Sequence, residues 1–293
     1  MEAIDRSPIA VAGATGTVGS LLVKRLVAEG QAVRALVRDS DRARQILDSG
    51  VELESCDLAD PQTLRPALEG VEKAFLLTGD IPPADDKLEL EANFIDAAAA
   101  AGVGHIVYLS VSPSDLEPEF AFRQWHGRSE RRLEESGVAW THLRPIAFMS
   151  NLLLSLDAIR SQGAFHLPTG DGRVSVIAPE DIAEVAARTL TEEGHAGSAY
   201  TLTGPEALSY REQAAQLSHA LGREIRFVDV PEQAAREAMS GALPAELTEA
   251  LLEFYRMVKD GERELLSDDF KKVAGRAPRS FSTWADQHAE AFD

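Results

Sequence analysis

The sequence predicts an α/β fold in which a doubly wound parallel sheet is followed by a smaller C-terminal α/β lobe. Near the start of the chain, residues 9–23 run from an apolar strand into a glycine-rich turn and then directly into a helix. Short apolar runs alternate with segments of helical composition up to Leu143, which is typical of a parallel sheet covered by helices on both faces. A length of 293 residues suits one such sheet domain and one smaller lobe.

The turn has the pattern Gly-x-x-Gly-x-x-Gly, formed by Gly13, Gly16 and Gly19. Gly13 permits a tight turn, Gly16 lets the backbone approach a pyrophosphate, and Gly19 allows the helix to pack closely on the strand. The N–H groups and the dipole at the start of the helix favour an anion. The alternative is a surface turn closed by a helix cap. We predict that the turn binds a dinucleotide through Gly13, Thr15, Gly16, Thr17, Val18 and Gly19.

The alternation of strands and helices continues after this turn. A helix is expected to start at Asp60 and Pro61, because proline favours the first helical position. Three more segments have helical composition: Asp41–Leu47, Asp85–Ala101 and Ala121–Ser136. The predicted strands are Ala32–Val37, Val51–Ser55, Val71–Thr78, His105–Val111 and Val138–Leu143. Ligands of such sheets bind outside the carboxyl ends of the strands, so the residues that follow each strand are the candidates for a site.

Arg38 follows the second strand, where the ribose of a dinucleotide would be recognised. A guanidinium at this place suits a 2′-phosphate through charge-assisted hydrogen bonds, whereas a carboxylate suits a free 2′-hydroxyl. The sequence therefore favours NADP(H) over NAD(H). Two observations keep the alternatives open: Asp39 is adjacent, and Arg38 is also compatible with a solvated side chain at a helix entrance.

Two further strand ends are candidates for cofactor contacts. Asp57 and Leu58 follow the third strand and can hold an adenine edge through side-chain and backbone hydrogen bonds, although Asp57 equally suits an ordinary turn. Thr78 and Gly79 follow the fourth strand, and their small size lets the ribose and pyrophosphate lie against the backbone.

Segments along most of the chain carry a resemblance to a known family. Besides the glycine turn and Arg38, these segments are Gly102–Ser110, Trp125–Glu134, Ser136–Pro145, Phe148–Asn151, Gly170–Val174, Pro179–Ala183 and Gly194–Gly204. Together they resemble the NmrA-like atypical short-chain dehydrogenases, and among these the bacterial NADPH-dependent quinone oxidoreductases. The resemblance implies a Rossmann domain, a smaller C-terminal domain that closes over the nicotinamide, and NADPH as the cofactor.

The catalytic pair of most short-chain dehydrogenases, Tyr-x-x-x-Lys, is missing from the helix before the sixth strand. The pattern occurs at Tyr255 and Lys259, inside a C-terminal amphipathic helix, where we interpret it as surface support. The resemblance instead points to His126 as a proton donor or substrate anchor, and to Ser110 as the active-site hydroxyl. The alternatives are a helix-face histidine bonded to a backbone carbonyl, and a serine that caps its strand.

The resemblance also places Pro145 beside the nicotinamide amide. It suggests a substrate pocket formed by Trp125, Phe148, Met149 and Asn151. Long apolar side chains are usually buried for packing, so Phe148 and Met149 are equally compatible with the core.

We expect residues 1–150 to form the NAD(P)-binding Rossmann domain, with the helix of residues 179–192 also packed on it. Residues 151–178 and 193–293 are expected to form the smaller substrate-binding lobe. Its predicted elements are the strand Ala199–Thr203, a helix from Ser209 with Glu212 completing a capping box, the strand Glu224–Val230, and helices from Pro231 and Pro244.

The composition excludes several classes of function. With 48 acidic and 29 basic side chains the net charge is −19, which disfavours nucleic acid and anionic membranes as partners. The single cysteine, Cys56, fits a reducing cytoplasm and reads as a buried small residue. The seven histidines lack metal-ligand spacing, and no signal peptide or membrane span is evident. The expected partner is a small-molecule substrate, and a homo-oligomer has no support in the sequence.

Three functions are compatible with these features. The favoured one is an NADPH-dependent oxidoreductase that transfers hydride to a quinone, an enone or a similar conjugated small molecule. The second is a non-catalytic NADP(H) sensor of the NmrA type, suggested by the missing Tyr-x-x-x-Lys pair beside an intact cofactor turn. The third is a redox-neutral isomerase on the same fold.

Overall fold

The computed structural model describes residues 7–79, 84–112 and 121–292 of the protein. Two compact units divide the chain, and both are assembled from several segments. Unit 1 comprises Met1–Leu116, Arg123–Arg144 and Ile182–Tyr200, and unit 2 comprises Glu117–Phe122, Pro145–Asp181 and Thr201–Asp293. No helix among the described residues is both long and apolar enough to cross a bilayer.

A seven-stranded sheet forms the centre of the α/β fold, with the strand order β10-β6-β5-β4-β1-β2-β3. The neighbours from β3 through β6 pair in parallel, for example with Ile9 opposite Val33 and Lys73. The strands are β1 (Ile9–Ala12), β2 (Val33–Val37), β3 (Glu52–Ser55), β4 (Lys73–Leu76), β5 (His105–Leu109), β6 (Ala139–Pro145) and β10 (Ser198–Leu202). This order reverses direction between β1 and β4, which makes the carboxyl ends of these two strands the expected ligand crevice.

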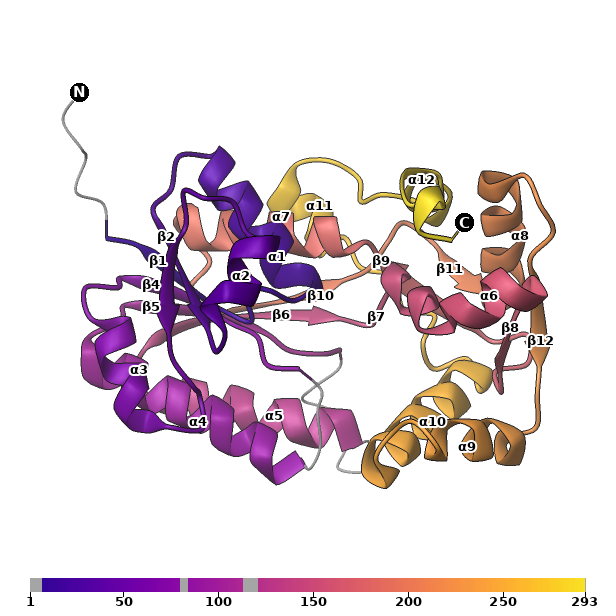
Figure 1. Ribbon diagram of the computed structural model, residues 1–293, viewed down its shortest axis with the longest axis horizontal. Helices are drawn as coiled ribbons and strands as arrows, with labels where there is room; N and C mark the ends of the chain where they lie inside the picture. Colours follow the sequence, from indigo (N-terminus) through magenta and orange to yellow (C-terminus); the bar gives the residue numbers. More distant parts are fainter. Residues whose placement is uncertain (1–6, 80–83, 113–120, 293) are drawn as a thin grey trace. The chain divides into compact units, whose positions relative to one another are not determined.

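Helices cover both faces of this sheet, as the doubly wound prediction requires. On one face lie α3, α4 and α5, and on the other α1 and α7 (Figure 1). The helices that connect these strands are α1 (Thr17–Ala28), α2 (Ser40–Ile46), α3 (Pro61–Leu68), α4 (Ala84–Ala101), α5 (Ala121–Glu135) and α7 (Pro179–Thr191). The predicted start of α3 is confirmed, because Asp60 accepts a hydrogen bond from the N–H of Gln62 and Pro61 is the first helical residue.

Apolar side chains of the strands pack against α3 and α4 in the core of unit 1. Phe94 and Ile106 are fully buried there, and Cys56 belongs to the same cluster. Burial, together with the nearby charges of Glu54 and Asp57, raises the pKa of the Cys56 thiol to about 11. Cys56 is therefore a packing residue and is not poised as a nucleophile at neutral pH.

One strand expected in the smaller lobe joins the seven-stranded sheet instead. The segment around Ala199–Thr203 was assigned to the smaller lobe, but β10 is the edge strand of the seven-stranded sheet, next to β6. The N–H of Gly197 donates to the carbonyl of Trp140 at 2.7 Å just before β10 begins. The order of elements along the chain does not reveal which sheet a late strand joins, since that depends on the tertiary pairing.

Unit 2 contains two small sheets with helices packed around them. Strand β9 lies between an antiparallel β11 and a parallel β7, while β8 pairs in parallel with β12. The strands are β7 (Ala147–Phe148), β8 (Ala164–Leu167), β9 (Arg173–Ile177), β11 (Ala207–Ser209) and β12 (Arg226–Asp229). The helices are η1 (Met149–Ser155), α6 (Leu156–Gln162), α8 (Tyr210–Leu221), α9 (Glu232–Ser240), α10 (Ala245–Lys259), α11 (Asp269–Ala274), α12 (Phe281–Gln287) and η2 (Ala289–Phe292).

The capping box at the start of α8 is confirmed. The N–H of Glu212 donates to the Ser209 hydroxyl at 3.2 Å, and the N–H of Ser209 donates to the Glu212 carboxylate at 2.8 Å. Hydrogen bonds from Ser209 hold the pKa of Glu212 below its usual value. Prolines stand at the N-caps of α9 and α10, as expected at Pro231 and Pro244.

Replacing Ser209 with alanine should lower the stability of unit 2, because the first turn of α8 loses an acceptor. We expect Ser209→Ala to cost about 1 kcal/mol of the free energy of unfolding, measured by urea denaturation followed by circular dichroism. Ser240→Ala is the matched control, since its exposed hydroxyl lies at the end of α9 and, within the described part of the chain, bonds the carbonyl of Arg236 alone. Equal stabilities of the two variants would show that the capping box contributes nothing measurable.

Candidate functional site

The turn between β1 and α1 presents backbone N–H groups without a side-chain cap. Gly16 is the N-cap residue of α1, no side chain accepts from the first turn, and that turn contains no acidic residue. The loop closes on itself through a hydrogen bond from the N–H of Gly16 to the carbonyl of Gly13, at 3.0 Å. Thr15, Gly16 and Thr17 are exposed, whereas Val18 and Gly19 are buried against the sheet. An uncapped and exposed helix start of this kind is suited to a phosphate group.

Two glycines of the turn occupy space that no side chain could share. Gly13 has a positive φ of 73°, and a Cβ there would lie 2.6 Å from the carbonyl oxygen of Leu77, after β4. A Cβ on Gly19 would lie 2.0 Å from the carbonyl oxygen of Gly13. The backbone can therefore pass this closely from strand to helix only with glycine at both positions. The residues present fit the pyrophosphate of a dinucleotide at the crevice between β1 and β4.

Two charged side chains follow β2: Asp39 caps the next helix, whereas Arg38 does not bond the described residues around it. Asp39 caps α2, because its Oδ1 accepts from the N–H groups of Asp41 and Arg42 at 3.0 Å each. Arg38 is exposed and makes no hydrogen bond or ion pair with the described residues. One oxygen of the competing carboxylate is thus used in helix capping, and the guanidinium is available for a 2′-phosphate.

The residues after β3 form a compact turn. The N–H of Asp57 donates to the Thr63 hydroxyl at 3.1 Å, and Asp57 Oδ1 accepts from the N–H of Ala59 at 3.0 Å. The carbonyl of Leu58 accepts from the Asn93 side chain at 3.0 Å. One oxygen of the exposed Asp57 carboxylate therefore serves the turn, which is the alternative that the sequence analysis left open, and an adenine contact would use its other oxygen.

A cluster of buried polar side chains lies between β5 and helices α4 and α5. We call it the Glu91 cluster; it consists of Thr78, Lys87, Glu91, Tyr108, His126 and Ser129, all of which are buried. Glu91 is fully buried and Lys87 is only 2% exposed, which is unusual for two charged side chains. They form an ion pair of 2.8 Å one helical turn apart on α4. Such a pair persists in the interior only when hydrogen bonds satisfy both of its members.

Hydrogen bonds reach the Glu91 carboxylate from four segments. Oε1 accepts from Lys87 and from the hydroxyl of Thr78, at 2.8 and 2.5 Å. Oε2 accepts from the hydroxyl of Ser129 on α5. The Tyr108 hydroxyl lies 3.2 Å from Oε1 and 3.1 Å from Oε2, and it also lies 2.8 Å from Nδ1 of His126. The carboxylate thus joins the end of β4, α4, β5 and α5.

The electrostatics of the cluster keep Glu91 charged and Tyr108 protonated. Burial alone would raise the pKa of Glu91, but the positive charges of Lys87 and His126 and the hydrogen bonds hold this pKa below its usual value. Burial and the adjacent Glu91 charge raise the pKa of Tyr108 well above the usual value. At neutral pH the cluster therefore contains a carboxylate, an ammonium and a neutral phenol.

The structure places both candidate catalytic residues in the interior of unit 1. His126 is 3% exposed, and its ring nitrogen bonds the phenol of Tyr108 where the alternative interpretation expected a backbone carbonyl. Ser110 follows β5 and is 2% exposed; its N–H donates to Leu143, but its hydroxyl has no partner among the described residues. A buried hydroxyl without a partner is rare, and this one suits a ligand atom. Trp125 is buried beside His126 on α5.

The remaining candidates have different surroundings. Thr78 belongs to the Glu91 cluster, and Gly79 beside it is exposed. Pro145 is buried at the end of β6. Met149 is 1% exposed in the core of unit 2, which is the packing role that the sequence left open. Half-buried Phe148 ends β7, and Asn151 is exposed on η1.

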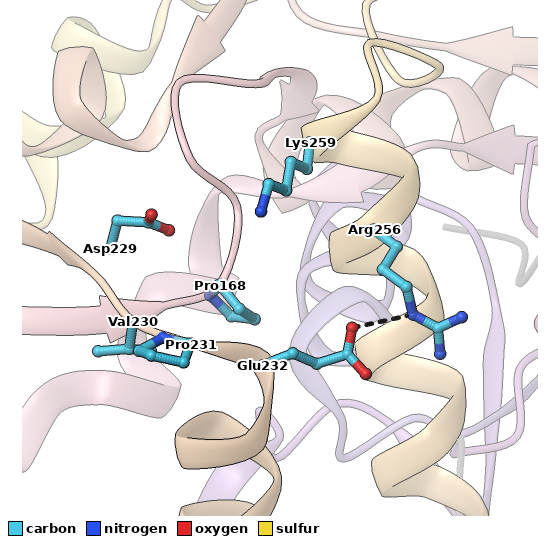
Figure 2. A pocket seen from close by; sticks show the side chains of 7 residues that line it. All are labelled: Pro168, Asp229, Val230, Pro231, Glu232, Arg256 and Lys259. Carbon is cyan, nitrogen blue, oxygen red and sulfur yellow. Dashed lines mark ion pairs between the residues drawn. The ribbon is translucent and has the colours of Figure 1, made fainter.

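The Tyr-x-x-x-Lys match lies on α10 in unit 2, away from the turn and the cluster in sequence. Burial raises the pKa of Tyr255 to about 12, and Lys259 is exposed. Lys259 lines a pocket of about 380 Å³ together with Pro168, Asp229, Val230, Pro231, Glu232 and Arg256 (Figure 2). Arg256 and Glu232 form an ion pair of 3.2 Å there. This polar pocket contains none of the candidate site residues.

A further acidic group on α5 is explained by an ion pair. Glu130, Glu134 and His142 each offer one potential ligand atom within 4.8 Å of the others. However, Arg144 binds Glu130 through two hydrogen bonds of 3.0 and 2.7 Å, and His142 bonds Glu134 at 3.1 Å. Because a guanidinium already neutralises Glu130, we interpret this group as an ion-pair network and assign no metal to it.

Sequence reasoning missed Lys87, Glu91, Tyr108 and Ser129. A signal for Glu91 was present, because it shares a helical stripe with the apolar Phe94 and Ala98, three and seven residues further along α4. A charged residue on the apolar stripe of a helix indicates a buried partner. Tyr108 is hidden within an apolar strand, and nothing in the sequence marks it as polar in function.

Comparisons with known proteins place the chain in a family. The sequence profile described as the NmrA-like family matches residues 5–285. This chain belongs to the NmrA-like family. It is 40% identical to an NAD(P)H azoreductase of Xenophilus azovorans, over 97% of this chain and 99% of the relative.

Two other members have comparable coverage. A (4-alkanoyl-5-oxo-2,5-dihydrofuran-3-yl)methyl phosphate reductase of Streptomyces griseus subsp. griseus is also 40% identical, over 97% of this chain and 99% of that protein. The crystal structure of the NADPH-dependent quinone oxidoreductase QOR2 of Escherichia coli, complexed with NADPH, superposes with a TM-score of 0.85. It is 29% identical and covers 95% of this chain and 99% of its own.

Replacing Arg38 with alanine should weaken NADPH binding far more than NADH binding, because only NADPH carries the 2′-phosphate. We expect a loss of about tenfold to a hundredfold in NADPH affinity, measured by fluorescence titration. Arg44→Ala on α2 is the control, since among the described residues its exposed guanidinium pairs with Asp41 alone. Equal losses for both dinucleotides would remove Arg38 from 2′-phosphate recognition.

Proposed function

We propose that this protein is an NADPH-dependent reductase that transfers hydride to a conjugated small molecule such as a quinone, an enone or an azo compound. The observation that carries this proposal is the uncapped glycine turn at the crevice of the sheet, in a chain 40% identical to proteins named as reductases. Arg38, whose neighbour Asp39 is occupied in capping, supports NADP(H) as the cofactor.

The names of the relatives support the class of substrate. An unsaturated lactone and a quinone contain a carbon–carbon double bond conjugated with a carbonyl group, and an azo group is itself a nitrogen–nitrogen double bond. Each accepts a hydride at one end of the conjugated system and a proton at the other. A site for this chemistry needs a hydride donor and a group that delivers or orients a proton.

The residues of unit 1 can supply these requirements. The bound nicotinamide supplies the hydride. The glycine turn would hold its pyrophosphate, and Arg38 would hold the 2′-phosphate. His126 would deliver a proton to the oxygen or nitrogen on which negative charge develops. The hydroxyl of Ser110, for which the described residues offer no partner, would orient a carbonyl or the nicotinamide amide.

The proposal predicts tight binding of NADPH and its oxidation by members of the conjugated class. We expect a titration to show NADPH preferred over NADH, and a stopped-flow assay at 340 nm to show oxidation with a panel of quinones, enones and azo dyes. Protein without added acceptor controls for reaction with oxygen. Tight binding without oxidation by any acceptor would contradict the reductase and favour a non-catalytic sensor.

Replacing His126 with glutamine should lower turnover and leave NADPH affinity intact. We expect about a hundredfold lower kcat with an enone, and a smaller loss with a quinone, because the aromatic hydroquinone anion is a weaker base that needs less acid assistance. His219→Gln, an exposed histidine on α8, is the control. An unchanged kcat with both acceptors would show that His126 does not donate a proton and has a structural role only.

A further inference from the structure

We propose that Glu91 and Tyr108 are positioning residues that hold one proton on Nδ1 of His126, so that Nε2 is the nitrogen that gives a proton to the substrate. The inference deepens the proposed function and rests on the proposed role of His126. It concerns a chain of two contacts, from the Glu91 carboxylate to the Tyr108 phenol and from the phenol to the imidazole.

The first step is the charge state of Glu91. A carboxylate accepts hydrogen bonds and donates none. Lys87, Thr78 and Ser129 all have hydrogens to donate, and all three are within hydrogen-bond distance of the carboxylate. The lowered pKa of Glu91 agrees with this count of donors. A fully buried anion surrounded by donors is therefore the fixed end of the chain.

The second step is the single hydrogen of the Tyr108 phenol. Its oxygen lies 3.2 and 3.1 Å from the two carboxylate oxygens of Glu91. Lone pairs facing an anion at this distance, in a dry interior, would repel it, so the O–H must point toward the carboxylate. The phenol then has only lone pairs to offer to His126 Nδ1, at 2.8 Å, and the imidazole nitrogen must be the donor.

The third step is the consequence for proton transfer. With Nδ1–H committed to Tyr108, the neutral ring carries its proton on Nδ1 and the charged ring carries a second one on Nε2. On reduction of the substrate, the Nε2–H bond breaks and a bond from hydrogen to the substrate oxygen or nitrogen forms. The imidazolium becomes the neutral Nδ1–H ring, and solvent restores the Nε2 proton. The anion of Glu91 stabilises the charged ring before the transfer.

The tautomer can be read directly by nitrogen NMR. In the full-length protein labelled with ¹⁵N-histidine, at a pH where the ring is neutral, His126→Gln identifies the His126 signals. We expect a pyrrole-like Nδ1 and a pyridine-like Nε2, the reverse of the Nε2–H form that free imidazole side chains favour. A wild-type ring with Nε2–H would overturn the inference.

Two substitutions test the two hydrogen bonds that connect Glu91 to Tyr108 and Tyr108 to His126. Tyr108→Phe removes the acceptor of Nδ1–H, so the ring should revert to the Nε2–H form. Glu91→Gln keeps the shape but introduces an N–H donor toward the phenol, which frees the phenol to donate to His126 and should also give Nε2–H. Both should lower kcat about tenfold or more with an enone, with the KM for NADPH unchanged. If Glu91→Gln fails to fold, Tyr108→Phe still decides the inference, and an unchanged tautomer there refutes it.

The chain offers a matched control in a second tyrosine and histidine pair. The Tyr200 hydroxyl lies 2.9 Å from Nδ1 of His195, and neither residue belongs to the Glu91 cluster. Tyr200→Phe should leave both the His126 tautomer and kcat unchanged. The readouts also separate the two proposals. If the His126 ring carries its proton on Nδ1 but none of the acceptors supports oxidation of NADPH, the reductase proposal alone is refuted. If the ring carries its proton on Nε2 in an active enzyme, the positioning proposal alone is refuted.

Discussion

The buried charge of Glu91 is the constraint on which the polar interior of unit 1 depends. A carboxylate with no exposed surface costs several kcal/mol in lost hydration, and removing one member of such a pair typically costs about 3–5 kcal/mol because the other charge is left uncompensated. Lys87 supplies the compensation one turn away on α4, and the other donors come from the end of β4, from β5 and from α5. Buried ion pairs add little net stability compared with apolar packing. This pair instead fixes the positions of the end of β4, α4, β5 and α5 relative to one another, since each donor must lie at one place for the carboxylate to be fully hydrogen-bonded.

The features that the sequence predicted well are those encoded within a few residues. The glycine turn could be read because a tight strand-to-helix passage needs glycine at Gly13 and Gly19, whatever the rest of the chain does. The start of α3 at Pro61 and the capping box of Ser209 and Glu212 are likewise local, since each joins groups no more than three residues apart. The parallel sheet followed from the alternation of strands and helices, which is a property of neighbouring segments.

The features that the sequence did not predict depend on contacts between distant segments. The sheet that β10 joins is decided by its pairing next to β6, more than fifty residues earlier in the chain. The partners of Glu91 lie 4, 13, 17 and 38 residues away along the sequence. The resemblance points to His126, but its bond to Tyr108 could not be predicted, because Tyr108 lies within an otherwise apolar strand.

The cluster also explains why Tyr108 and Lys87 do not act as the catalytic tyrosine and lysine pair of the usual short-chain dehydrogenases. A tyrosine and a lysine are both present in unit 1, as Tyr108 and Lys87, but a carboxylate lies between them. Lys87 neutralises Glu91, and burial together with the Glu91 charge raises the pKa of Tyr108, so the phenol is a poor acid. In the usual pair the lysine has the opposite effect and lowers the tyrosine pKa. The phenol here can fix the direction of a hydrogen bond but cannot readily release its proton, which is why our proposal gives the proton transfer to the imidazole of His126 and only positioning to Tyr108.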